Sequence, residues 1–401
     1  MIAEANYGGR ITDDRDRRLI KVYAKEIFHD GLIGIDKWKP PGTDEYNYGY
    51  PFDEANVKQD PEELFVPHLF FEEIMNKMET IDQPAAFGQH INAEITSQIM
   101  DSNELLESIL SLQPQKVSSD GESRETKVLK LISDLAENIP QAVDVGAVKY
   151  KLRNDDNPLN VVLIQELQRY NILLGVLRAS LEQLEKGIKG LVLISPELEA
   201  VLTSLFENKV PKSWSFAYFS LKPLATWMRD LCERYNFLQT WAVKTLPHVF
   251  WIGAFTYPTG FTTSLLQRYS RRGGAPSIDK LEFDFIPIQK QVKDVTEPAK
   301  DGSYITGLYL EGAKWNFEKM CLMEPEVMEL TVLMPVIQFK PIQKRVKPPQ
   351  NVYECPCYYY PIRQGTVDKD SFMLKIDLKL GEQSADFWVK RGTALVMSLA
   401  A

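Results

Sequence analysis

The spacing of apolar residues changes along this chain, and that change restricts the folds that are possible. Between residues 163 and 188 the apolar positions alternate steps of four and three, through Leu163, Leu167, Tyr170, Leu174, Leu177, Leu181, Leu184 and Ile188. This 3.5-residue period predicts one long amphipathic helix after Pro158. From Phe372 to Leu380 apolar and polar residues alternate singly, which is typical of a half-buried strand. Helical segments precede the strands, so the predicted class is α+β rather than a doubly wound parallel sheet.

Changes in composition divide the sequence into three predicted parts, 1–114, 115–278 and 279–401. The polar stretch from Gln115 to Glu125 marks the first boundary. In the first part we expect a Pro- and Gly-rich loop at 38–52 and helices at 12–29, 61–79 and 101–112. The second part holds the long helix and further helices that begin at Pro196 and Pro223.

The third part, 279–401, is predicted to be rich in strands. We expect them at 281–285, 304–310, 331–339, 352–360, 372–380 and 393–399. Short strands separated by Gly and Pro at this spacing favour an antiparallel, barrel-like arrangement or a sandwich. So much apolar β structure without an accompanying catalytic motif suggests a part that docks on another surface.

Charge and composition argue against several classes of function. The net charge of -9 argues against a nucleic-acid binder, because phosphate contacts need concentrated Lys and Arg. No apolar run reaches membrane-spanning length, and the first 20 residues are charged rather than signal-like. Reduced thiols explain the scattered cysteines better than disulfides or a zinc site, and the histidines form no cluster. We therefore expect a cytosolic protein with no nucleic-acid, membrane or metal partner.

Two glycine motifs resemble phosphate-binding loops but have simpler explanations. Gly307 and Gly312 have the required spacing, yet Ala313 comes before Lys314, and Trp315 replaces the hydroxyl that would hold magnesium. A strand whose glycines let another backbone pass closely accounts for these residues better.

The second glycine motif lies near the N-terminus. Gly8, Gly9 and Arg10 stand beside Asp13 and Asp14, an arrangement that an anion site with a magnesium carboxylate would also use. A glycine turn that leads into a capped helix accounts for the same residues.

Other candidate sites have similarly plain interpretations. Arg271 and Arg272 before two glycines indicate the end of a helix. Cys355 or Cys357 would need a neighbouring base and a lowered pKa to act as a nucleophile. Core packing is the expected role of the four tryptophans, Trp214, Trp227, Trp241 and Trp251. The residues alone thus predict a packing module with no catalytic, cofactor or metal residues.

Several motifs, in order along nearly the whole sequence, resemble those of one family, the C-terminal region of dynein heavy chains. The first is Tyr7 to Asp14, with Gly8, Gly9, Arg10, Asp13 and Asp14. The others are Phe87-Gly88-Gln89-His90 with Asn92 to Thr96, Lys189 to Val192, Ser220 to Leu224 with Lys222 and Pro223, Gly307 to Trp315 with Glu311 and Gly312, Cys355-Pro356, and Arg391-Gly392 with Thr393 to Leu395.

The resemblance is closer to the axonemal branch than to the cytoplasmic one, on Leu310 to Trp315 and on Phe250-Trp251 followed by Phe261 to Thr263. Two stretches depart from the family pattern. Pro84 to Phe87 lacks the usual acidic and β-branched pair, and Val367 to Asp370 is shorter than usual. The resemblance implies a place in the cytoplasm and cytoskeleton, in the axoneme of a cilium or flagellum.

The resemblance also implies a division of labour within a longer motor. Residues 1–114 would be the helical lid of the sixth AAA+ module, which does not hydrolyse ATP, and 115–401 the C-terminal domain. That domain would lie across the motor ring of the same polypeptide and influence force and processivity. ATP and magnesium would bind upstream modules, and microtubules would be reached only through a stalk outside this sequence. The partners implied are the ring and the axonemal dynein complex.

Two alternatives remain at this point. One is a hydrolase with Cys355 or Cys357 as its nucleophile. The other is a cytosolic coiled-coil scaffold that uses the heptads of 163–188.

Overall fold

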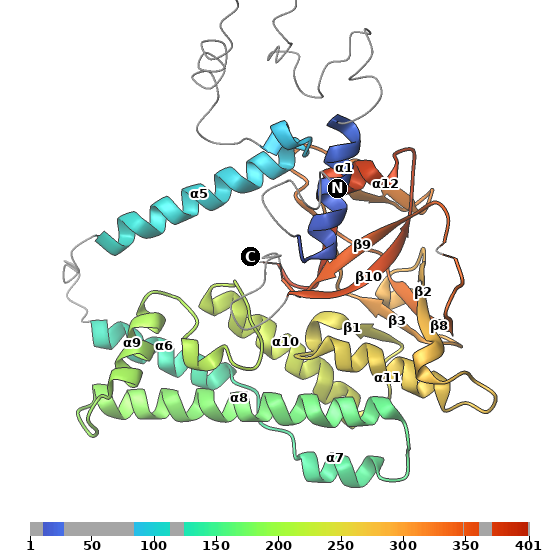
Figure 1. The fold of residues 1–401 in the computed structure, drawn as a ribbon. Helices are drawn as coiled ribbons and strands as arrows, with labels where there is room; N and C mark the ends of the chain where they lie inside the picture. The colour runs from blue at the N-terminus through green and yellow to red at the C-terminus, as the bar shows by residue number, and fades with distance from the viewer. Residues whose placement is uncertain (1–10, 28–83, 113–123, 348, 361–370, 400–401) are drawn as a thin grey trace, which may run out of the picture.

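The computed structural model describes residues 11–27, 84–112, 124–347, 349–360 and 371–399 (Figure 1). Several predicted features lie outside these described residues: Gly8, Gly9 and Arg10, the loop at 38–52 and the helix at 61–79. None of the helices within the described ranges is long and apolar enough to cross a membrane.

Most of the described α-helices lie in the N-terminal two thirds of the sequence. They are α1 (Asp14–Ile27), α5 (Ile91–Leu112), α6 (Arg124–Asn138), α7 (Val145–Leu152), α8 (Pro158–Ile188), α9 (Pro196–Phe206), α10 (Leu224–Val243) and α11 (Pro258–Ser270), with α12 (Ala385–Lys390) near the C-terminus. Short 3₁₀ turns lie between them: η2 (Pro84–Phe87), η3 (Lys212–Trp214), η4 (Ile252–Ala254), η5 (Ile278–Lys280) and η6 (Val292–Asp294).

Helix α8 confirms the long helix that the 3.5-residue period predicts. Asn157 caps it through Oδ1, which accepts a hydrogen bond from the Leu159 amide, and Pro158 occupies its first turn. Its apolar stripe from Leu163 to Leu184 is buried. Helices α6, α7, α9, α10 and α11 of the same polypeptide pack against it. Because the stripe is covered in cis, the structure does not favour a coiled-coil partner.

Most other helix predictions are confirmed, and one begins too late. The helix expected at 12–29 is α1 where those residues are described, and α9 and α10 begin at their prolines as expected. Helix α11 ends with Arg271 as its C-cap. The helix predicted at 101–112 instead starts at Ile91 and runs through without a glycine or proline. The Ser102 hydroxyl donates to the Gln98 carbonyl within the helix, so it does not cap a new one.

The described strands form open sheets rather than a closed barrel, so the barrel-like expectation is wrong. A four-stranded sheet has the order β1-β3-β8-β2, and a five-stranded sheet has the order β10-β9-β11-β4-β7, with β5 and β6 as a separate pair. The strands are β1 (Val249–Trp251), β2 (Leu281–Pro287), β3 (Ser303–Thr306), β4 (Tyr309–Glu311), β5 (Lys314–Asn316), β6 (Cys321–Met323), β7 (Thr331–Leu333), β8 (Ile337–Gln343), β9 (Val352–Tyr358), β10 (Phe372–Lys379) and β11 (Ala394–Val396). The sheets are mixed, because β1 pairs with β3 and β11 with β9 in parallel.

Two predicted strands are each split between the sheets. The strand expected at 304–310 divides at Gly307 into β3 of the four-stranded sheet and β4 of the five-stranded sheet. The strand expected at 331–339 divides at Met334-Pro335 into β7 and β8, again in different sheets. The backbone thus passes twice between the sheets, and these crossings hold them together.

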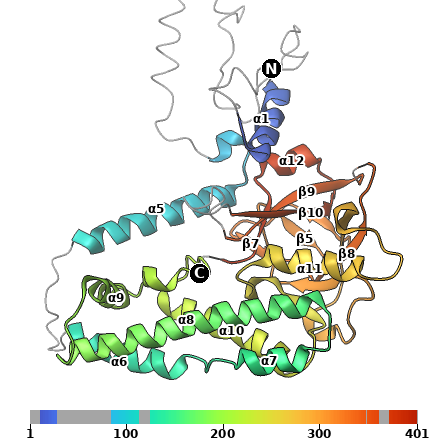
Figure 2. The same ribbon diagram turned by 60° about the horizontal axis from the view of Figure 1, so that its bottom comes forward.

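Helices and sheets share one continuous hydrophobic core. A single cluster of buried side chains extends from Val22 of α1 through α6, α8 and α10 to β9, β10 and α12. Figures 1 and 2 show the layer of α6 to α10 on one side of the sheets, while α5 runs from the region of α1 and α12 towards α9. The α+β class is therefore confirmed, with both kinds of structure in one body.

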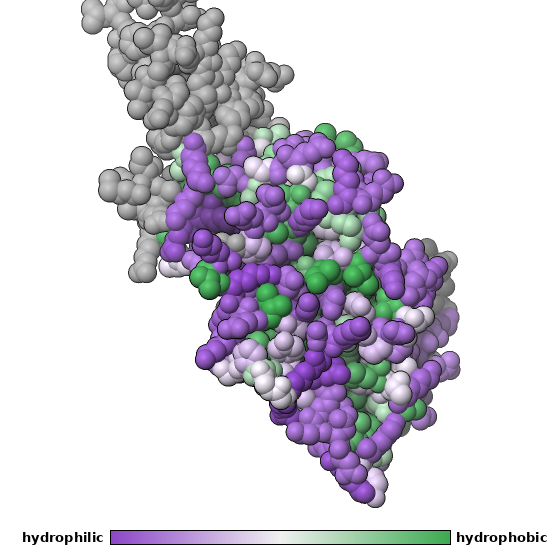
Figure 3. Space-filling view, turned by 90° about the vertical axis from the view of Figure 1, so that its right-hand side faces the viewer, coloured by the Kyte–Doolittle hydropathy of each residue, from purple (hydrophilic) through white to green (hydrophobic). Residues whose placement is uncertain are grey.

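The outer surface is mixed in character. On the face seen in Figure 3, hydrophilic residues surround several separate groups of apolar side chains. Exposed apolar side chains also lie on α5, at Leu105, Leu106 and Ile109.

Candidate functional site

The motif residues gather at two junctions between distant parts of the sequence. The first, which we call the N-terminal junction, joins α1 and residues 87–92 to the β-rich part. Arg18 of α1 donates from Nη1 to the Glu354 carbonyl over 2.8 Å and from Nη2 to the Tyr353 hydroxyl over 3.3 Å. Lys25 pairs with Asp386 of α12 over 3.1 Å. Helix α1 is thus held to β9 and α12 by backbone and side-chain contacts.

The turn at Phe87 and Gly88 fits closely against α12. Tyr23 donates from its hydroxyl to the Phe87 carbonyl, and Arg391 donates from Nη1 to the Gly88 carbonyl over 3.2 Å. Gly88 has φ +73°, and a Cβ there would lie 2.8 Å from Cε of Lys390. Glycine therefore permits both the left-handed backbone and the close approach.

Asn92 makes the most specific contact of the N-terminal junction. Its Nδ2 donates to the carbonyls of Glu326 (2.8 Å) and Glu329 (3.0 Å), and its Oδ1 accepts from the Met328 amide (2.9 Å). The residue is 6% exposed. One buried amide thus meets three backbone groups of a loop more than 230 residues away in sequence.

His90 supports this turn from within. Its Nδ1 accepts a hydrogen bond from the Asn92 amide over 3.1 Å. Burial and the nearby Arg391 guanidinium lower the pKa of His90. The neutral imidazole that can accept this bond is therefore favoured.

The glycines near Arg391 complete the N-terminal junction from the β-rich side. Gly312 has φ +70°, and a Cβ there would lie 2.7 Å from the Arg391 carbonyl oxygen. The Thr393 hydroxyl donates to the Gly312 carbonyl over 3.1 Å. Gly392, at φ +65°, turns the backbone from α12 into β11. Glu311 lies in the same sheet, opposite Ala394.

Trp315 and the acidic pair near the N-terminus have structural positions. Trp315 is buried in β5. The Asp13 carboxylate accepts from the amides of Arg15 and Asp16 and pairs with the Arg15 guanidinium, which holds the Asp13 pKa at about 2. Asp14 is exposed and pairs with Arg17 over 2.9 Å. These contacts are those of a helix start.

The second junction, the helix–sheet junction, is built on a buried charge cluster. Lys222 reaches one oxygen of Asp230 over 3.0 Å, and Nε of Arg234 reaches the other over 2.6 Å. Nη1 of Arg234 also donates to the Gly253 carbonyl. Asp230 and Arg234 are each 5% exposed on α10, with Pro223 at its N-cap. Pairing makes burial of these charges tolerable.

Gly307 lies at the same junction, and its position explains the false phosphate-loop pattern. It has φ +90°, and a Cβ there would overlap the indole ring of Trp251. The glycine is required because the Trp251 side chain passes over the point where the backbone leaves β3 for β4.

The candidate nucleophiles do not lie in an environment that favours catalysis. Cys355 and Cys357 are both buried in β9. Burial raises the pKa of Cys357 to about 12, so its thiol stays protonated near neutral pH. Among the described residues, no group of three or more His, Cys, Asp and Glu side chains is placed to hold a metal ion.

The tryptophans act as core residues rather than a ligand cage. Trp214 and Trp227 stack at 6.0 Å between ring centroids, and both are buried. Trp241 packs edge-on against Phe250.

A helical N-terminal segment fixed to a mixed helix-and-sheet body is the arrangement expected of a dynein lid followed by a dynein C-terminal domain. Family models match on both sides: the AAA lid domain of dynein heavy chains at residues 1–93, and their C-terminal domain at residues 99–397. The protein therefore belongs to the dynein heavy chain family.

Its relatives include axonemal and flagellar dyneins. Over its whole length it is 42% identical to mouse dynein axonemal heavy chain 2 and 42% identical to the dynein-1-beta heavy chain of the flagellar inner arm I1 complex of Chlamydomonas reinhardtii. It is 36% identical to rat dynein axonemal heavy chain 1 over 99% of its own length. The sequence spans only 9% of the length of the first two relatives.

Sequence reasoning missed the buried polar groups of the helix–sheet junction. Asp230 and Arg234 stand four residues apart beside the apolar stripe of α10, a spacing that would have signalled an ion pair. Glu166 of α8 was also missed; it is 1% exposed and accepts from the Thr256 amide over 2.8 Å.

Proposed function

We propose that this protein is a non-catalytic, structural and regulatory part of an axonemal dynein heavy chain. It packs on the AAA+ ring of the same heavy chain and modulates the force or processivity of movement along microtubules. The observation that carries the proposal is the single core, which extends without a break from α1 through the helices to the sheets and α12.

A continuous core supports a mechanical role. A lid segment that moves with the ring would carry the attached domain with it, because the contacts of the N-terminal junction resist independent motion. Arg18, Lys25 and Asn92 supply polar contacts at that junction, and Val22 supplies buried apolar area. The domain would then act as a stiff cap that couples neighbouring parts of the ring.

The proposal extends to place and partners. The names of the relatives support a location in the axoneme of a cilium or flagellum, within the cytoskeleton, and assembly into an axonemal dynein complex. ATP and magnesium belong to upstream modules of the parent motor, and microtubules are reached only through its stalk. We expect no nucleic-acid or membrane partner.

The test has one experiment on the isolated 401-residue protein and one on the motor. The purified protein should hydrolyse no magnesium-ATP and should not sediment with microtubules. In the motor, removal of residues 115–401 should change stall force or run length while the ring retains ATP hydrolysis. ATP turnover by the isolated protein, or a truncated motor with unchanged force and run length, would refute the proposal.

A further inference from the structure

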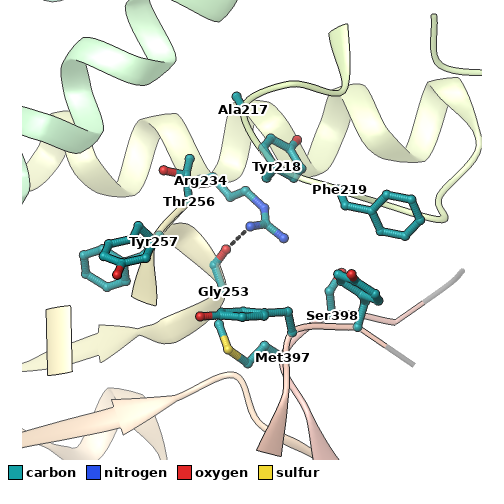
Figure 4. Close-up of a pocket in the computed structure, with 12 residues that line it drawn as sticks. Ala217, Tyr218, Phe219, Arg234, Gly253, Thr256, Tyr257, Met397 and Ser398 are labelled. Carbon is teal, nitrogen blue, oxygen red and sulfur yellow. Dashed lines mark hydrogen bonds between the residues drawn. The ribbon is translucent and has the colours of Figure 1, made fainter. Parts of the chain in front are cut away.

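A cavity of about 380 Å³ lies beside the helix–sheet junction (Figure 4). Residues 217–219 and α10 form one side, and the ends of β9 and β11 form the other. Its volume falls within the range of ligand-binding pockets. Any molecule that fills it would contact the helical and β-rich parts together.

The walls of the cavity are largely aromatic. Rings from both parts line it: Tyr218, Phe219, Phe255, Tyr257, Tyr359 and Tyr360. Phe219 of the helical part lies 4.6 Å from Tyr360 of the β-rich part, measured between ring centroids. Such walls suit an aromatic or branched apolar group.

One wall also carries a buried positive charge. Figure 4 shows the Arg234 guanidinium between Tyr218 and Gly253, with its bond to the Gly253 carbonyl. Lys222 and Arg234 share the single carboxylate of Asp230, so this cluster keeps one positive charge uncompensated. The nearby Glu166 does not offset it, because Glu166 pairs with Arg169 over 2.9 Å. A negative group in the cavity would balance the cluster.

Two hydroxyl groups of the lining lack partners. The hydroxyls of Tyr218 and Tyr360 are buried and accept or donate no hydrogen bond within the described structure. The two residues are 7% and 5% exposed. Burial raises the pKa of Tyr218, so its hydroxyl remains a donor at neutral pH. Unsatisfied buried hydroxyls are costly, and an acceptor that reached them would remove that cost.

From these features we propose that the cavity is a binding site for a small carboxylate with an aromatic or branched apolar body. The carboxylate binds beside Arg234 and the Tyr218 hydroxyl, and the apolar body lies among the rings of Phe219, Tyr359 and Tyr360. The bound molecule strengthens the helix–sheet junction, because it adds contacts to both sides. This inference goes beyond the proposed function, and binding can be measured whether or not the protein docks on a motor ring.

The experiment is titration calorimetry on the purified protein with indole-3-propionate, beside its neutral amide and inorganic phosphate. We expect one saturable site for the carboxylate. The amide should bind at least about tenfold more weakly, since it lacks the charge-assisted hydrogen bond to Arg234. Phosphate tests whether charge alone is sufficient, and it should bind more weakly than the carboxylate.

Matched variants locate the binding. Ala217→Leu narrows the cavity from its wall, whereas Ala225→Leu makes the same change at an exposed position of α10. Tyr218→Phe removes one unpartnered hydroxyl and keeps the ring. Circular dichroism confirms that each variant is folded. The proposal expects Ala217→Leu to abolish binding, Tyr218→Phe to weaken it and Ala225→Leu to leave it unchanged.

Other results overturn the proposal. They are no binding of the carboxylate, equal binding of the carboxylate and the amide, phosphate binding as tight as that of the carboxylate, or equal binding by folded Ala217→Leu and Ala225→Leu variants.

Discussion

Replacement of Asn92 by alanine would test the N-terminal junction most sharply. The substitution removes two hydrogen bonds to the carbonyls of Glu326 and Glu329 and one from the Met328 amide, all at a residue that is 6% exposed. A typical hydrogen bond contributes a net of about 1 kcal/mol, so these bonds together predict a loss of about 3 kcal/mol. The backbone groups left behind would find no other partner unless water enters the junction.

Urea unfolding followed by circular dichroism measures this loss, and hydrogen exchange at residues 324–330 shows whether the loop opens locally. The matched control is Asn138→Ala, because Asn138 is exposed and its side chain donates within its own helix, to the Asp134 carbonyl over 2.7 Å. The control should change stability by less than about 0.5 kcal/mol. If Asn92→Ala matched the control in both unfolding free energy and exchange at Met328, the account of this junction would be wrong.

Three further predictions concern the backbone, pH and the thiols. Gly307→Ala should cost about 2–4 kcal/mol in unfolding free energy, because of its positive φ and the Trp251 ring, whereas Gly175→Ala, with nothing within 4 Å, should gain roughly 0.5–1 kcal/mol; equal effects would contradict this. The Asp13 pKa is lowered from 3.8 to about 2, so its ionised form stabilises the fold above pH 4 and that contribution is lost as the pH falls towards 2; a stability difference between wild type and Asp13→Asn that did not shrink over this range would oppose the assignment. Iodoacetamide at pH 7.5 should modify the half-buried Cys232 before the buried Cys357, and rapid modification of Cys357 would revive a cysteine nucleophile.

Local patterns predicted much of the secondary structure. The stripe of α8 was readable because each of its apolar residues recurs at a helical spacing and the whole stripe is buried on one side. Strands β2 and β10 were readable by alternation, since each has seven or more residues. Three-residue strands such as β1 and β5 carry too few positions for a period to emerge, and they were missed.

Long-range arrangement was much less accessible. The crossing at Gly307 depends on the Trp251 ring, which is 56 positions earlier and gives no local signal. The barrel-like expectation failed because spacing between strands does not reveal which edges pair or that β9 and β11 run parallel. The motif residues were identified by family resemblance, and only the fold explains why Asn92, Gly312 and Arg391 belong together.

The central claim is that the N-terminal segment, the helices and the sheets form one rigid body around one core. Differential scanning calorimetry of the purified protein tests this claim most directly. We predict a single transition whose calorimetric enthalpy equals its van't Hoff enthalpy, as for one cooperative unit. Two separate transitions, with the α6 to α10 region melting apart from the β-rich part, would contradict the claim and favour a tethered module.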